Sequence, residues 1–168
     1  QETIIFDAAR LRRHTVLEVA PGARLLAGEI IVLGRTAMGE SVNGGLVHEA
    51  WDVRRDDRLV WADAVHLDDD LPTTLAANAG LNGAHAFASI VFVGDDAESA
   101  LPFARELLPD GADPAGLCVG ATCVGDVLVV RWLDRDARRL RDAYGQFWAD
   151  FRHRVADFPA EMPRLWAI

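Results

Sequence analysis

The 168-residue chain contains no lysine, only two cysteines and no apolar run of 18 residues. Because a transmembrane helix needs about 20 consecutive apolar residues, we expect no membrane span. Two cysteines do not make a disulfide framework, and Cys118 and Cys123 would face opposite sides of an extended segment. We interpret both as buried small side chains in a reducing compartment, and the lack of a visible signal peptide predicts a cytoplasmic protein.

The charge balance is strongly acidic. All 17 basic residues are arginines and stand against 26 acidic residues, which gives a net charge of −9. This excess argues against nucleic acid as a partner, because binding to phosphates relies on clustered basic side chains. Hydrophobic residues make up 51% of the chain. This share excludes a disordered tail and is enough for a globular core.

Motifs of the common enzyme classes are also missing. The sequence has neither the GxxxxGK[ST] phosphate loop nor GxGxxG, so nucleotide binding has no support. HExxH, CxxC and Cys/His clusters are absent, which leaves no recognisable zinc site. GxSxG is absent as well, and no serine stands beside an obvious histidine and aspartate partner. We therefore expect a protein that is not an enzyme.

Strand-like patterns dominate residues 1–70, and residues 73–168 mix strands with helices. Residues 24–35 are apolar at successive positions and predict a strand covered on both faces. Alternating apolar residues predict two hairpins, one around Asp56-Asp57 and one across Gly125-Asp126.

Helical patterns appear in the last third of the chain. We predict a helix over about residues 97–108, and a longer one that Asp134 or Asp136 caps and Pro159 ends. Residues 1–168 are accordingly expected to form a single, mainly β domain with two helices toward its C-terminus.

Three carboxylates stand in or beside apolar strands. Glu29 and Glu49 each share a strand face with aliphatic or aromatic residues, and Glu40 follows a bend bracketed by Gly34 and Gly39. A carboxylate on a buried face costs several kcal/mol unless it pairs, binds a cation or takes up a proton. Arg35 is roughly 20 Å along the strand from Glu29, so a partner must come from a neighbouring strand. Two interpretations stay open: buried Arg–Glu pairs, or a polar interior that conducts cations.

Histidines and terminal aromatics give weaker signals. His48 and His66 would be cross-strand neighbours if the hairpin register allows it, although edge or surface histidines are the simpler interpretation. The stripe from Tyr144 to Phe151 is typical of a core-facing helix. Arg164 and Trp166, at the end of the chain, are residue types that interfaces favour, which predicts contact with a partner. The alternative is that this segment folds back on the domain.

The sequence also resembles a known family in several segments. They are the opening Gln1 to Asp7, Pro21-Gly22-Ala23, the stretch from Glu29 to Glu40 and the late Pro163-Arg164-Leu165-Trp166. These look like the urease accessory protein UreD, called UreH in some organisms. The match runs in order over the whole chain and corresponds to roughly the C-terminal three fifths of a typical member. The N-terminal strands of the family are missing.

The resemblance implies a non-catalytic maturation factor with a mostly β fold, a β-helix-like stack of strands with a few helices. Members bind the urease apoprotein together with the accessory proteins UreF and UreG, and help deliver nickel to the urease active site. No cofactor would be bound permanently, and nickel would be in transit. Carboxylates suit such transit because oxygen ligands hold the ion weakly enough to release it. We expect Glu29, Glu40 and Glu49 to line the path, and Arg35, Arg164 and Trp166 to face partners.

Two other functions remain open at this point. One is a protein-interaction module without a metal role, in which the buried carboxylates only pair with arginines. The other is a small metal-dependent hydrolase that uses His48, Glu49 and Asp63. The residue types are its only support, because nothing in their spacing indicates a metal site.

Overall fold

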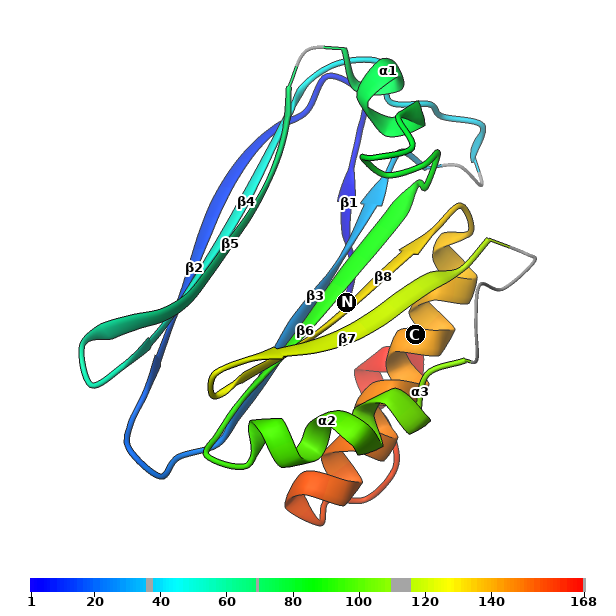
Figure 1. The fold of residues 1–168 in the computed structure, drawn as a ribbon. Coiled ribbons are helices and arrows are strands. Elements are labelled where there is room, and N and C mark those ends of the chain that lie inside the picture. The colour runs from blue at the N-terminus through cyan, green and yellow to red at the C-terminus, as the bar shows by residue number, and fades with distance from the viewer. Residues whose placement is uncertain (36–37, 69, 110–115, 168) are drawn as a thin grey trace.

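The computed structural model of the protein describes residues 1–35, 38–68, 70–109 and 116–167 (Figure 1). The elements, in chain order, are β1 (Thr3–Ile5), β2 (Arg10–Val19), β3 (Leu25–Leu33), β4 (Leu46–Arg55), β5 (Arg58–Asp68), α1 (Leu71–Ala76), β6 (Ala86–Val93), α2 (Ala97–Glu106), β7 (Cys118–Val124), β8 (Val127–Asp134), α3 (Ala137–Ala156) and a final 3-10 turn (Arg164–Ala167). The mainly β fold with two helices toward the C-terminus is as the sequence predicts.

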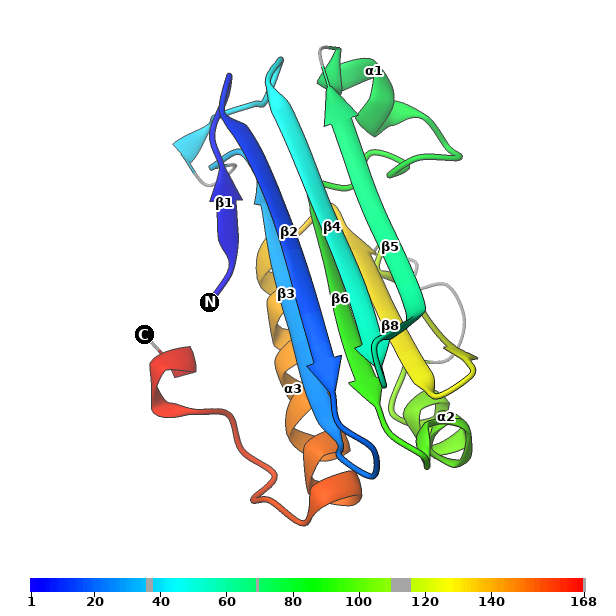
Figure 2. The same ribbon diagram turned by 90° about the vertical axis from the view of Figure 1, so that its left-hand side faces the viewer.

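The strands form two sheets that face each other. The five-stranded sheet has the order β1-β3-β6-β8-β7, and the three-stranded sheet has the order β2-β4-β5. Figure 2 shows the three-stranded sheet in front of the five-stranded one, with the strands of both sheets running in similar directions. The chain alternates between the sheets for its first four strands, with β1 parallel to β3 and β2 parallel to β4. This winding is the β-helix-like part of the fold, whereas the later strands pair antiparallel to their neighbours.

Both predicted hairpins are present. Asp56 and Asp57 adopt positive φ angles of 49° and 60° between β4 and β5, the geometry of a two-residue type I′ turn. Gly125, with φ of 56°, begins the turn between β7 and β8. These turns fix the register of each hairpin and hence the face on which each side chain lies.

Helices α2 and α3 cover the outer face of the five-stranded sheet (Figure 1). Asp136 caps α3 by accepting hydrogen bonds from the backbone N–H groups of Arg138 and Arg139. The predicted aromatic stripe of α3 packs against the sheet, with Tyr144 and Phe147 in edge-to-face contact with Trp132. The stripe is therefore core.

The space between the sheets holds two separate apolar clusters. One gathers around Ile31, Leu33 and Val47, and the other around Trp51 and Val53. Alternate residues of a strand share a face. Glu29 shares its face of β3 with Ala27 and Ile31, and Glu49 shares its face of β4 with Val47 and Trp51. Both glutamates therefore point into the space between the sheets.

The cysteines differ in part from the prediction. They lie on opposite faces of β7, and Cys123 packs against the core beneath the helices. Cys118 is exposed, because its face of this edge strand carries no covering layer, so it is not the buried side chain that the sequence suggested.

Candidate functional site

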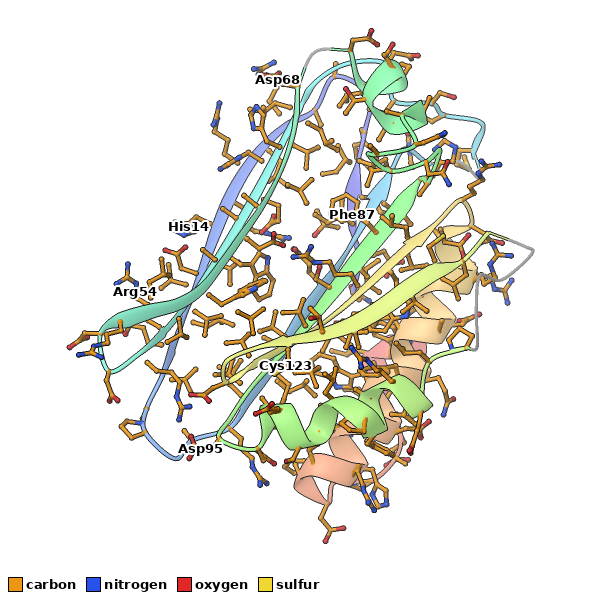
Figure 3. The ribbon with its side chains drawn as sticks, in the orientation of Figure 1. His14, Arg54, Asp68, Phe87, Asp95 and Cys123 are labelled. Atoms are coloured by element: carbon orange, nitrogen blue, oxygen red, sulfur yellow. The ribbon has the colours of Figure 1, made fainter. Side chains whose placement is uncertain are left out.

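Three strands bring one arginine and two glutamates together between the sheets. Arg13 on β2 is the direct cross-strand partner of Glu49 on β4. Glu29 reaches them from β3 in the opposite sheet. In Figure 3 the side chain of Phe87 lies in this space between the sheets, whereas His14 lies on the outer side of the three-stranded sheet. We call Arg13, Glu29 and Glu49 the inter-sheet cluster.

Arg13 binds both carboxylates at once. Its Nε donates to Oε2 of Glu49 at 2.6 Å, and its Nη2 donates to Oε2 of Glu29. Its Nη1 donates to Oγ1 of Thr3 on β1 at 3.3 Å. The indole Nε1 of Trp51 supplies a further donor to Oε1 of Glu29, at 2.8 Å. A partner from another strand is thus present, although Arg13 reaches Glu29 from the facing sheet and not from a neighbour of β3 in its own sheet.

The cluster carries more negative than positive charge. The side chain of Glu49 is 1% exposed, that of Glu29 is 11% exposed and that of Arg13 is 36% exposed. Burial, followed by the nearby charge of Glu49, raises the pKa of Glu29 above its ordinary value. Oε1 of Glu49 is buried with no hydrogen-bond partner among the described residues. One arginine therefore faces two carboxylates, and a buried oxygen is left without a hydrogen bond among the described residues.

A second ion pair extends the polar layer across the sandwich. Arg131 on β8 donates to Asp63 on β5 at 2.6 Å, which links the two sheets. The register places Ser89 of β6 between Glu29 and Arg131, on the same face of the five-stranded sheet. Polar side chains thus run from the β1 edge to the β5 side, between the two apolar clusters.

Glu40 lies apart from this layer. It follows the end of β3, and Glu29 is four residues, or about 13 Å, before that end. Its Oε2 accepts hydrogen bonds from Nε of Arg35 at 2.8 Å and from the Arg35 backbone N–H at 3.1 Å. The side-chain hydrogen bond from Arg35 is the main cause that lowers the pKa of Glu40. The structure thus brings Glu29 and Glu49 together but leaves Glu40 in an ion pair at the bend.

The residues predicted to face partners have different surroundings. The Arg35 guanidinium lies 4.7 Å from the ring centre of Phe6. Arg164 is exposed. Trp166 folds back on α3, where its ring stacks on Tyr144 at 5.8 Å and lies 4.5 Å from the Arg141 guanidinium.

The residues of the hydrolase interpretation do not converge. Glu49 and Asp63 point between the sheets, and Asp63 is paired with Arg131. His48 is the cross-strand partner of His66 on the opposite face of the same sheet. In the described part of the chain, no group of three or more His, Cys, Asp or Glu residues could hold a metal ion.

Arg13 is the site residue that the sequence analysis missed. A usable signal was present, because Leu11, Arg13, Thr15 and Leu17 share the half-buried face of β2, whereas the residues between them are exposed. An arginine on such a face indicates a buried acidic partner.

The fold and the site together define a β-rich protein with an arginine–carboxylate cluster between its two sheets. No helix among the described residues is long and apolar enough to cross a membrane. The chain belongs to the UreD family: residues 1–167 match the family described as UreD urease accessory protein.

Curated relatives carry the same description over nearly the whole chain. A protein from Magnetococcus marinus named urease accessory protein UreD is 44% identical over 169 residues, which cover 100% of this chain and 58% of that protein. A protein from Methylorubrum populi named urease accessory protein UreD 2 is 42% identical over 166 residues, which cover 99% of this chain and 53% of that protein. A Ruegeria pomeroyi relative is 35% identical and has 61% of its length covered. The chain therefore spans little more than half the length of these relatives.

Proposed function

We propose that this chain serves in urease maturation as a non-catalytic factor that helps deliver nickel to the urease active site. Membership of the UreD family supports the maturation role. The scattered positions of His48, Glu49 and Asp63 support a role without catalysis. The cytoplasmic location predicted from the sequence stays a prediction.

In this proposal the inter-sheet cluster is a stage on the path of the ion. The observation that carries it is the buried Oε1 of Glu49, which has no hydrogen-bond partner in the described part of the chain and belongs to a cluster of two carboxylates and one arginine. A divalent cation that enters would bind this oxygen and compete with Arg13 for the others. Because carboxylate oxygens bind nickel less strongly than imidazole or thiolate does, and Arg13 restores the ion pairs afterwards, the ion is released readily.

The partners in this proposal are the urease apoprotein and the accessory proteins UreF and UreG. Arg164 is exposed and free to meet a partner, and the bend that carries Arg35 also carries Met38, whose side chain is among the most exposed apolar ones at 78%. The ring of Trp166 packs on Tyr144, so Trp166 would support partner binding by holding the C-terminal segment on α3.

The test places Glu49→Gln and Glu29→Gln in the full-length protein in cells that express urease. We expect urease activity and nickel content to fall while pull-down of urease with the variants persists, because a neutral amide is a poorer cation ligand. Glu18→Gln is the matched control, since Glu18 is an exposed glutamate of β2 and should leave both measures unchanged.

The competing function is an interaction module without a metal role. The hydrogen bonds from Arg13 to both carboxylates favour it, because they already give each carboxylate a charged partner within the cluster. Normal nickel content in the Glu49→Gln and Glu29→Gln strains, with a loss of stability or of urease binding, would refute the ion path and leave this alternative.

A further inference from the structure

A pair of histidines lies on the outer face of the three-stranded sheet, away from the inter-sheet cluster. His48 on β4 and His66 on β5 are direct cross-strand partners. Their neighbours Glu49 and Val47 on β4 and Leu67 on β5 are buried, so the alternation turns both imidazoles outward. The side chain of His66 is 51% exposed. An ion in solution therefore has access to the pair.

The two Nδ1 atoms lie 3.2 Å apart, and the ring centres are 5.3 Å apart at an interplanar angle of 68°. Bonds from imidazole nitrogen to a divalent transition metal are about 2.0–2.1 Å long. With such bonds, two donors separated by 3.2 Å subtend an angle of about 100° at the metal. This angle lies between those of ideal octahedral and tetrahedral coordination, so the separation of the two Nδ1 atoms suits two ligands of one ion.

The surroundings add an anionic group on the far side of His66. Oδ2 of Asp68 lies 3.9 Å from Nε2 of His66, the ring nitrogen that faces away from His48. A carboxylate at that side adds negative charge near a cation held by His66. Arg12 is the cross-strand partner of His48 on β2, and Arg10 lies 4.0 Å from Asp68. These cations weaken the site but leave its two nitrogen donors in place.

We propose that His48 and His66 form a surface site for one divalent transition-metal ion of the class that prefers imidazole, such as Ni²⁺, bound through the two Nδ1 atoms and completed by water. Imidazole is a suitable ligand for divalent nickel, copper and zinc ions. The inference does not rest on the nickel path between the sheets, because it uses other residues on another face.

The experiment titrates the 168-residue chain, free of any polyhistidine tag, with NiCl₂ in isothermal titration calorimetry. We expect a site in the unchanged chain that depends on the two histidines, with Ni²⁺ binding at this site weakened at least about tenfold in His48→Ala and in His66→Ala. His14→Ala is the matched control: His14 is a histidine on the same outer face that lies 3.3 Å from Asp52, and the variant should bind Ni²⁺ normally. Circular dichroism melts check that all variants fold.

Glu49→Gln separates this site from the inter-sheet cluster, and we expect it to keep the calorimetric site. Unchanged binding in both His48→Ala and His66→Ala, or no binding in the unchanged chain, would overturn the proposal. Loss of the site in His14→Ala or Glu49→Gln would place the ion elsewhere and would also overturn it. A failed nickel path, seen as normal nickel content in the Glu49→Gln strain, leaves these results unaffected.

Discussion

Replacing Arg13 with glutamine tests how much of the stability of the sandwich depends on the inter-sheet cluster. The change removes the cation that binds Glu29 and Glu49 and leaves both buried carboxylates without it. Breaking a buried ion pair from one side costs about 3–5 kcal/mol. Because the Arg13 side chain is 36% exposed and water partly screens its charge, we expect the lower figure of about 2–3 kcal/mol in the free energy of unfolding at pH 7.

The deficit of Arg13→Gln should shrink as the pH falls. Without the arginine, the pKa of Glu29, already raised by burial and by Glu49, rises further in the folded state. The folded protein then binds more protons than the unfolded chain at pH values just above the ordinary glutamate range, so lower pH favours folding. The loss at pH 5 should therefore be smaller than the loss at pH 7.

Urea denaturation at pH 7 and pH 5 measures both effects. Arg12→Gln is the matched control, since Arg12 is the exposed neighbour on the outer face of the same strand and should change the free energy by less than about 0.5 kcal/mol. A double change of Arg13→Gln with Glu49→Gln should recover part of the loss. Equal deficits at both pH values, or an Arg13→Gln loss no larger than that of Arg12→Gln, would refute the reasoning.

Two further substitutions test the bend and the packing beneath the helices. Since Arg35 lowers the pKa of Glu40, the stabilisation from Glu40 is present above pH 4.5 and is lost as the pH falls through the lowered pKa. Glu40→Gln should thus lower the melting temperature clearly at pH 7 and much less at pH 3. Nickel content in cells should stay normal. Reduced nickel content at an unchanged melting temperature would instead assign Glu40 to the ion path. A Cβ at Gly28 would lie 2.6 Å from the Ser89 carbonyl oxygen, so Gly28→Ala should lower the free energy of unfolding by about 1–3 kcal/mol in urea denaturation. A Cβ at Gly120 would meet open space, so Gly120→Ala should cost less. Equal losses for the two variants would contradict this reasoning.

Much of the local structure follows from the sequence alone. Alternating apolar residues determine the strands around the Asp56-Asp57 turn, because a strand side chain changes face at every residue. Residues 24–35 are apolar at successive positions, which assigns Glu29 to a covered face before any partner is known. The α3 pattern and its Asp136 cap are local as well, since capping involves only the first turn of the helix.

The tertiary structure alone decided which charges meet. Arg13 reaches Glu49 through the parallel register of β2 and β4, and reaches Glu29 only because the two sheets pack face to face. It also decided that Trp166 lies on α3, where Gly145 leaves room for the indole ring. Sequence periodicity gives the face of each side chain but not the partner strand, since pairing between distant segments depends on the packing of the whole chain.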